Sequence, residues 1–276
     1  MSEFSLLSLN SFGIPFYMGW GRLKRLTREL DRIGVTAICL QEVQQNAYAP
    51  LVRRGLTTYP HHVFERHRYA PKGGLAVFSR LPLSRHHFEV YRDRGAWHSL
   101  SIADWALYKG ILSVHLDVDG QQVVVLNTHM NANYSGIWHR ENPLVQIQVH
   151  QVEQLSQAIH SISEDTLLIV CGDLNFPRTS FLYDDLISGG QLIDPMADDP
   201  RSTYRPFPLV PAKWNIPLDY VLYRQPVHKD VQVHADLIEV EDSEKNHPIQ
   251  RFLTDHNALS LKISWDSAKP GSNGEG

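Results

Sequence analysis

Short runs of apolar residues alternate with amphipathic stretches along the chain, which predicts strands interleaved with helices. The strand-like runs cover residues 4–10, 35–43, 73–80, 84–91, 97–105, 110–118, 121–129, 166–175, 218–224 and 257–265. Asp119-Gly120 separates two of these runs and is a strong short-range signal for a hairpin turn. The middle of the chain is therefore predicted to be rich in antiparallel strands.

The stretches between the runs carry helical spacing or helix-end signals. Helices are predicted over residues 23–33, 46–55, 142–162 and 180–188. Gly34 would end the first helix, Asn142-Pro143 would begin the third, and Gly189-Gly190 would end the last. Apolar residues trace one stripe along the third helix. Two packed sheets with helices outside satisfy this order, so the predicted fold class is α/β.

The composition indicates an ordinary globular protein. We expect one domain over residues 1–265 and a disordered tail over 266–276. Hydrophobic residues make up 42% of the chain, and no run approaches the roughly 20 apolar residues of a membrane span. The N-terminus has no positive start, so we expect no secretory signal and a cytoplasmic location. Cys39 and Cys171 lie in predicted core strands and are expected to be free thiols.

The net charge of −4 argues against a protein that holds nucleic acid mainly by bulk electrostatics. The segment from Arg53 to Arg94 differs, because nine Lys or Arg residues stand against three acidic residues there, a net of +6. This segment is either an ordinary solvated face or a surface that steers an anionic substrate or a membrane.

Two of the predicted strands end in residues that suit a metal ion. Asn10 ends the first strand, and Glu42 ends the second, where a charge is unfavourable unless it is paired or bound to a cation. Adjacent parallel strands would set the Asn10 amide beside the Glu42 carboxylate. Oxygen ligands that leave room for water and phosphate suit Mg²⁺, with Mn²⁺ as an alternative. Glu42 could equally be a solvated residue at a strand end.

The other candidates lie in short polar motifs. His129 follows a strand in NTHMNANY, although a single histidine is often structural. The glycine of GDLN permits a sharp exit from its strand, so Asp173 and Asn175, in an extended segment, could aim at one point. Asp219 in LDYVLYR could orient His256 in LTDHNALSL, which would leave the other ring nitrogen free to take a proton from water.

The ordered motifs LSLN, QEV, NTH, GDLN, LDY and TDH resemble the endonuclease/exonuclease/phosphatase superfamily over roughly residues 4 to 264. The resemblance implies a four-layered α/β sandwich of two packed mixed β-sheets flanked by helices. It also implies a metal site at Glu42, Asn10 and Asp255, a general base at His256 oriented by Asp219, and contacts of Asp173, Asn175 and His129 with the nucleophile, the phosphate and the leaving oxygen.

Three further features are similar to the neutral sphingomyelinases. They are LNSFGIPF after the first strand, NTHMNANY with its Tyr134, and ADWALYKG with Asp104 and Lys109. Asp104 and Lys109 resemble a switch that controls access to the site, or they simply flank a strand. The resemblance adds Tyr134 and Lys109 to Asn175 and His129 as residues expected to bind substrate.

The aromatic residues support a lipid substrate, and other parts of the sequence argue against stable membrane docking. Aromatic side chains cluster near the first ligand and after His129, at Phe12, Phe16, Tyr17, Trp20 and Trp138. They suit a lipid interface, or they pack against the core. The sequence lacks the membrane-spanning helices of the animal enzymes and the export signal and aromatic hairpin of the bacterial ones. Residues 233–252 are polar and acidic instead.

The function predicted from these patterns is Mg²⁺-dependent hydrolysis of a phosphodiester by in-line attack of water, with a phospholipid head group as substrate. One alternative is an endonuclease or exonuclease acting on DNA or RNA, and another is an inositol-phosphate-type phosphatase. A non-catalytic binding module is disfavoured because every acid, base and ligand position is filled. We expect a monomer without a transmembrane segment.

Overall fold

The computed structural model describes residues 1–13, 19–95, 105–205, 216–245 and 252–266. Its strands are β1 (Ser2–Asn10), β2 (Ala37–Gln41), β3 (His61–Val63), β4 (Ala76–Ser79), β5 (Arg85–Val90), β6 (Gly110–Val118), β7 (Gln121–His129), β8 (Leu167–Asp173), β9 (Asp219–Arg224), β10 (Gln232–Ile238) and β11 (Ala258–Trp265). Its helices are α1 (Gly19–Ile33), α2 (Tyr48–Gly55), α4 (Pro143–His160) and α5 (Phe181–Gly190), with a 3-10 helix η1 (Lys72–Gly74). Some predictions fall outside the described residues: the strand at 97–104, the tail at 267–276, Phe16, Tyr17 and Asp104.

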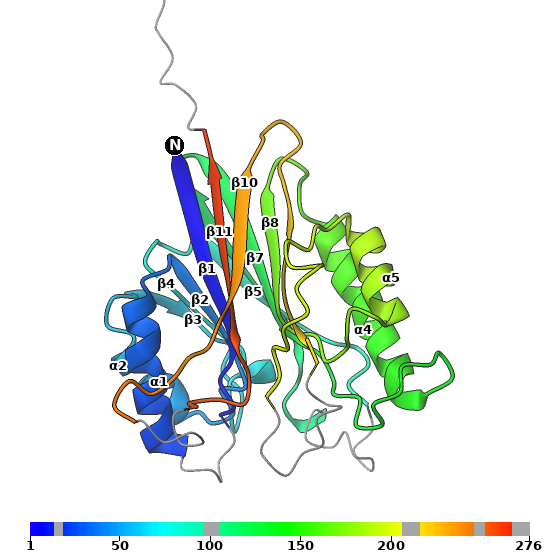
Figure 1. Ribbon diagram of the computed structural model, residues 1–276, viewed down its shortest axis with the longest axis horizontal. Coiled ribbons are helices and arrows are strands. Elements are labelled where there is room, and N and C mark those ends of the chain that lie inside the picture. Colours follow the sequence, from blue (N-terminus) through cyan, green and yellow to red (C-terminus); the bar gives the residue numbers. More distant parts are fainter. Residues whose placement is uncertain (14–18, 96–104, 206–215, 246–251, 267–276) are drawn as a thin grey trace, which may run out of the picture.

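The strands form two mixed sheets that pack face to face (Figure 1). The first sheet has the order β10-β11-β1-β2-β4-β3, and the second has the order β5-β6-β7-β8-β9. Each sheet contains one parallel pair, β1 with β2 and β7 with β8, and its other pairs are antiparallel. The carboxyl ends of both parallel pairs face the same edge of the sandwich, because Glu42 after β2 and His129 and Asp173 at the ends of β7 and β8 line one cavity.

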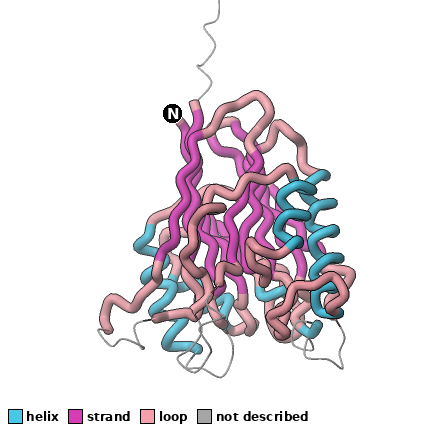
Figure 2. Tube along the Cα trace, turned by 45° about the vertical axis from the view of Figure 1, so that its right-hand side comes forward, coloured by secondary structure: helices cyan, strands magenta, loops and turns pink. Residues whose placement is uncertain are grey.

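Helices cover the outer face of each sheet, so the molecule has four layers (Figures 1 and 2). One apolar cluster fills the space between the sheets. A second lies between the first sheet and the helices α1 and α2, and a third lies between the second sheet and α4 and α5. Cys39 and Cys171 are buried free thiols in the central cluster, as predicted. The predicted four-layered α/β sandwich is confirmed.

Local signals read from the sequence place most element ends. Asp119 and Gly120 both have positive φ in the turn between β6 and β7, which is the geometry of the predicted hairpin. The Asn142 side chain accepts a hydrogen bond from the backbone N–H of Leu144, and Pro143 begins α4. Gly34, with φ of 84°, follows the last residue of α1.

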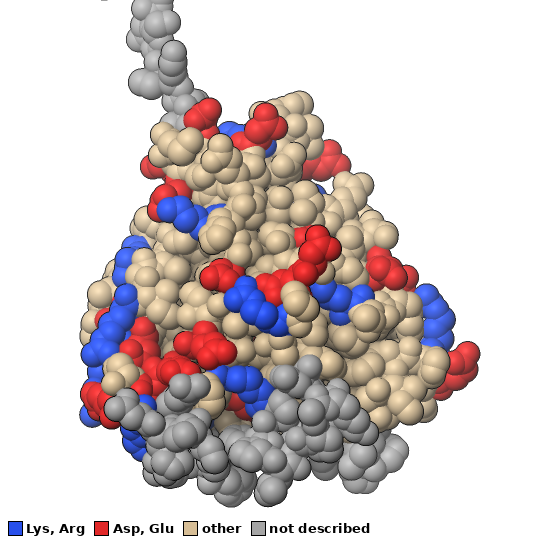
Figure 3. Space-filling view, in the orientation of Figure 1, with Lys and Arg blue, Asp and Glu red and all other residues tan. Residues whose placement is uncertain are grey.

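Charges of both signs are interspersed over the face of the molecule in Figure 3. Within the basic segment, Arg80 donates a hydrogen bond to the carbonyl of Gly34 at 2.9 Å, and the Arg94 guanidinium lies over the rings of Trp105 and Tyr108. These arginines make contacts within the fold. No helix in the described ranges is both long enough and apolar enough to cross a bilayer.

Candidate active site

The two parallel strand pairs bring the predicted site residues together from both sheets. In the first sheet Asn10 pairs with Gln41, so Glu42 follows directly at the end of β2. In the second sheet His129 pairs with Asp173, and Asp173 pairs with Asp219 on the other side. Residues separated by most of the chain thus meet at one edge of the two-sheet sandwich.

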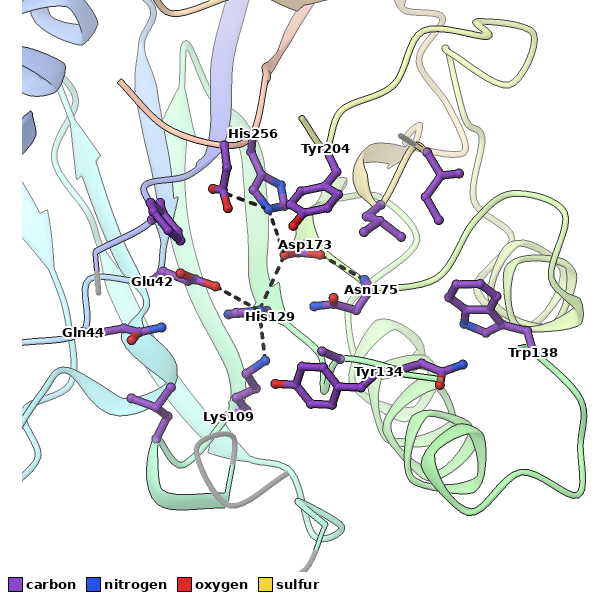
Figure 4. A pocket seen from close by; sticks show the side chains of 17 residues that line it. Glu42, Gln44, Lys109, His129, Tyr134, Trp138, Asp173, Asn175, Tyr204 and His256 are labelled. Atoms are coloured by element: carbon purple, nitrogen blue, oxygen red, sulfur yellow. Dashed lines mark hydrogen bonds and ion pairs between the residues drawn. The ribbon is translucent and has the colours of Figure 1, made fainter. Parts of the chain in front are cut away.

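A cavity of about 450 Å³ opens at this edge (Figure 4). Its walls include eight residues predicted to act in the site, namely Glu42, Lys109, His129, Tyr134, Asp173, Asn175, Asp255 and His256. Asn10 and Asp219 do not line the cavity but lie behind it, at 1% exposure each. All ten predicted residues therefore belong to one cluster.

His256 and Asp219 form a buried hydrogen-bonded pair. The distance from His256 Nδ1 to Asp219 Oδ2 is 2.8 Å, which leaves Nε2 facing the cavity. Burial lowers the pKa of His256, but the Asp219 charge and hydrogen bond, with help from Asp255 and Asp173, raise that pKa well above its usual value. The imidazole is thus oriented by a carboxylate, as the sequence predicts, and binds a proton strongly.

Asp173 lies between the two histidines. Its Oδ2 accepts a hydrogen bond from Asn10 Nδ2 at 3.0 Å and lies 3.6 Å from His129 Nε2 and 3.9 Å from His256 Nε2. Burial and the charge of Asp219 raise the pKa of Asp173 to about 7. This carboxyl group can therefore gain or lose a proton near neutral pH.

Lys109 and His129 form the other end of the cluster. Lys109 is 1% exposed, and its Nζ donates to the Met130 carbonyl at 2.7 Å and to His129 Nε2 at 2.9 Å. Because an ammonium group has only donors, Nε2 accepts and the proton of neutral His129 is on Nδ1. Burial, with the charges of Lys109 and His256, lowers the pKa of His129 well below its usual value. The His129 ring is therefore neutral.

Glu42 and Asp255 are the residues best placed to hold a divalent cation. Burial and repulsion from Asp255 raise the pKa of Glu42, and burial also raises the pKa of Asp255. The two carboxylates are partly buried, with side chains 18% and 9% exposed, and carboxylates that repel each other in such a place are stabilised by a cation between them. Their oxygens, beside a cavity with room for water and phosphate, fit a hard ion such as Mg²⁺.

Within the described residues, Asp173, Asp219 and His256 also have ligand atoms within 4.8 Å of one another. His256 Nδ1 and Asp219 Oδ2 already bond to each other, so we interpret this group as a hydrogen-bonded pair with Asp173 3.9 Å from the other ring nitrogen. Asn10 contacts Asp173 and Glu42 through its side chain, while its Oδ1 accepts from the backbone N–H of Phe12 at 3.0 Å. A direct ligand role for Asn10 stays a prediction.

Two local expectations about GDLN were wrong. Gly172 lies within β8 at φ of 136°, and a Cβ there would meet the Thr128 carbonyl oxygen at 1.9 Å. It therefore serves the close approach of β8 to β7 and not an exit from the strand. Asn175 is left-handed, with φ of 57°, and its backbone N–H donates to Asp173 Oδ1 at 3.0 Å. This turn, and not an extended segment, brings Asn175 to the cavity.

Tyr204 is a cavity residue that the sequence patterns did not indicate. Its ring lies 5.0 Å from the ring of His256, and Tyr204 and His256 also form an isolated β-bridge. Burial and the charges of Asp255, Asp173 and Glu42 raise the pKa of Tyr204, so it stays a neutral phenol. No strand or helix pattern surrounds it, and only its place in STYR, close to apolar runs, could have drawn attention to it.

The amino-acid sequence is similar to that of a putative neutral sphingomyelinase of Drosophila melanogaster, at 26% identity over 280 residues. The match covers 97% of this chain and 62% of that protein, so the chain spans less than two thirds of this relative's length.

Three solved structures share the fold. Sphingomyelinase C from Streptomyces griseocarneus aligns with a TM-score of 0.70 and 24% identity, covering 95% of this chain and 99% of that one. Beta toxin from Staphylococcus aureus, solved with bound magnesium ions, gives 0.72 and 18%, with coverages of 95% and 99%. D. rerio TDP2 complexed with a single strand DNA product gives 0.71 and 16%, with coverages of 96% and 100%.

The predicted resemblance to sphingomyelinase-like members of a phosphoesterase superfamily is confirmed by these likenesses and by one family model. That model describes the endonuclease/exonuclease/phosphatase family and matches residues 18–256, most of the chain. Its description names enzymes that cleave phosphate esters, in agreement with the predicted class of enzyme. The chain belongs to the endonuclease/exonuclease/phosphatase family.

Proposed function

We propose that this chain is a divalent-metal-dependent phosphodiesterase that uses water to cleave a phospholipid of the sphingomyelin kind. One observation carries the proposal: the Asp219–His256 pair faces Asp173 and two crowded carboxylates in a single cavity. The relative named a putative neutral sphingomyelinase supports this substrate class.

His256 is the group that accepts the proton of water. Because Nδ1 bonds to Asp219, Nε2 is the nitrogen that faces the cavity. As the water oxygen forms its bond to phosphorus, its proton passes to Nε2, and Asp219 stabilises the imidazolium that results. A divalent cation held by Glu42 and Asp255 would withdraw charge from the phosphoryl oxygens.

Lys109 supplies positive charge and a proton at the other end of the cluster. Its ammonium group can contact a phosphoryl oxygen and can donate a proton to the leaving oxygen as the bond from phosphorus breaks. His129 Nε2 holds the ammonium group in place at 2.9 Å. A direct contact of His129 with the phosphate or the leaving oxygen, as the family resemblance implies, stays a prediction.

Aromatic side chains support a phospholipid as substrate. Among the described residues, the aromatic side chains that line the cavity are Phe12, Tyr134, Trp138 and Tyr204. Aromatic faces attract quaternary ammonium groups, and aromatic residues suit a boundary between apolar and wet surroundings. Tyr134 is 49% exposed, so it can reach a lipid at the mouth of the cavity.

A nuclease is the second candidate, because D. rerio TDP2 shares the fold and its structure contains single strand DNA product. The same residues could act on a nucleic acid phosphate. The net charge of −4 and the use of Arg80 and Arg94 in contacts within the fold favour the lipid.

The test is a hydrolysis screen with Mg²⁺, Mn²⁺ or EDTA on sphingomyelin, phosphatidylcholine, inositol phosphates, and single- and double-stranded DNA. We expect phosphocholine release from sphingomyelin that requires the metal. It should be lost in His256→Ala and kept in His86→Ala, which changes an exposed histidine on β5. Cleavage of DNA without cleavage of lipid would overturn the lipid assignment, and full activity of His256→Ala would overturn the mechanism.

A further inference from the structure

Helix α4 carries a second buried stripe beside its apolar one, and its members are glutamines. Gln148 and Gln151 are fully buried, and Gln154 is nearly so. Residues three apart lie on one face of a helix, so these side chains point the same way. Buried amides need hydrogen-bond partners, and the Nε2 group of each glutamine donates to backbone carbonyls outside the helix. The stripe therefore binds other segments to α4.

Gln148 joins the chain segments that follow two neighbouring strands. Its Nε2 donates to the carbonyl of Asn131, after β7, at 2.8 Å and to the carbonyl of Asn175, after β8, at 2.9 Å. Between these segments, the Met130 carbonyl accepts from Lys109 Nζ at 2.7 Å and from Asn175 Nδ2 at 3.0 Å. The buried Gln148 amide thus fixes the backbone of residues 131 and 175, beside the end of the cavity where Lys109 and Asn175 lie.

Gln151 holds the same segment by a reciprocal pair of bonds. Its Oε1 accepts from the backbone N–H of Asn131 at 2.9 Å, and its Nε2 donates to Asn131 Oδ1 at 2.8 Å. The same Nε2 donates to the Asp93 carbonyl at 2.9 Å, and Asn131 Nδ2 donates to the Arg94 carbonyl at 2.9 Å. The exit from β5 is therefore tied to the segment after His129.

We propose that Gln148 and Gln151 are positioning residues of the phosphodiester site, which set Lys109, His129 and Asn175 through the backbone of residues 130–131 and 175. Neither glutamine lines the cavity, so neither touches substrate. The expected effect on rate rests on the proposed function, whereas the effect on the backbone does not.

The first test uses Gln148→Met, which keeps the side-chain length and removes both hydrogen bonds. Measured well below the unfolding temperature, it should lower kcat about 10- to 100-fold with KM little changed, because small misplacements of catalytic groups are costly. Gln157→Met, on an exposed position of α4, is the matched control and should keep wild-type kcat.

A double-mutant cycle separates positioning from general damage. In a Lys109→Ala/Asn175→Ala background, Gln148→Met should lower kcat by less than about twofold, because the groups that these segments present to the substrate are already gone. If the two losses instead multiply in full, the proposal is overturned.

Hydrogen exchange without substrate tests the same idea independently of activity. Peptides covering residues 129–133 and 173–176 should exchange faster in Gln148→Met than in wild type or Gln157→Met. Unchanged exchange there would overturn the positioning role. If Gln148→Met does not fold, Gln151→Met replaces it in every arm. A wild-type protein that cleaves no phosphodiester would remove the proposed function, and the exchange result alone would then decide the proposal.

Discussion

The His256 ring is held by Asp219 through Nδ1, and its Nε2 faces the cavity, so loss of His256 should slow the chemical step. We predict that His256→Ala lowers kcat by roughly 10²- to 10⁴-fold, the usual contribution of a general base. Mg²⁺ affinity should change little, since Glu42 and Asp255 remain. Steady-state kinetics and titration calorimetry measure the two quantities. A variant that loses Mg²⁺ binding together with activity would show that His256 acts as a ligand.

Asp219 should set the pH range in which His256 works. Burial lowers the pKa of His256, but the Asp219 carboxylate raises this pKa by more, so the net shift is upward. The protonated ring cannot act as a base. Asp219→Asn removes that charge, so His256 should lose its proton at a lower pH, and the acidic limb of the kcat profile should move to lower pH as kcat falls. Asp185→Asn, on a surface position of α5, is the control and should leave the limb unmoved. An acidic limb that stays in place in Asp219→Asn contradicts the assignment.

The site residues that sequence could predict are those at the ends of apolar strands. Glu42, His129 and Asp173 follow or end such strands, and parallel strands end at one edge; Asp219 begins β9, which runs antiparallel to β8 and so starts at the same edge. Tyr204 follows no strand pattern and was missed. The buried glutamines of α4 were missed for another reason: a polar residue on a predicted helix is assumed to face solvent unless its partners are known.

Strands were predictable where they are buried and long. The sequence of β10 predicts a polar, acidic insertion and not a strand, because most of its residues are only half-buried or exposed at the edge of the first sheet. β3 has three residues, too few for a periodic signal. Pairing, and not side-chain pattern, defines both strands. Edge strands of this kind are therefore harder to predict than the apolar strands β7 and β8.

A buried amide pair connects the two sheets below the cavity and should contribute to stability. Gln41 Nε2 of β2 donates to Asn127 Oδ1 of β7 at 2.8 Å, and Asn127 Nδ2 donates to the Leu40 carbonyl at 3.1 Å. Asn127→Leu removes both hydrogen bonds and leaves Gln41 Nε2 with only the longer bond to Ser8 Oγ at 3.2 Å, so we predict a loss of about 1–3 kcal/mol in unfolding free energy. Urea denaturation measures it, with Gln122→Leu on the exposed side of β7 as control. A loss no larger than that of the control would contradict the structural role.

The repulsion between Glu42 and Asp255 should be visible in the stability of the whole molecule. In EDTA, Glu42→Gln should unfold at a higher temperature than wild type because it removes one of two like charges that repel each other in a partly buried place. Added Mg²⁺ should stabilise wild type, by about 2.7 kcal/mol at a hundred times its Kd, and stabilise the variant much less. Differential scanning calorimetry with and without Mg²⁺ checks both, and Glu153→Gln on the surface of α4 is the control. Equal Mg²⁺ shifts in wild type and Glu42→Gln would rule out this metal site.

Because Glu42 comes from one sheet and Asp173 from the other, neither sheet alone contains all the residues of the active site. A chain that has formed its strands and helices, but whose two sheets have not yet packed together, would have no catalytic activity. During refolding, turnover should return after the far-ultraviolet signal of secondary structure, and the delay would time the final docking step. Recovery of activity would thus mark the completion of folding, and a partly folded chain would not cleave any membrane lipid or polymer that it meets.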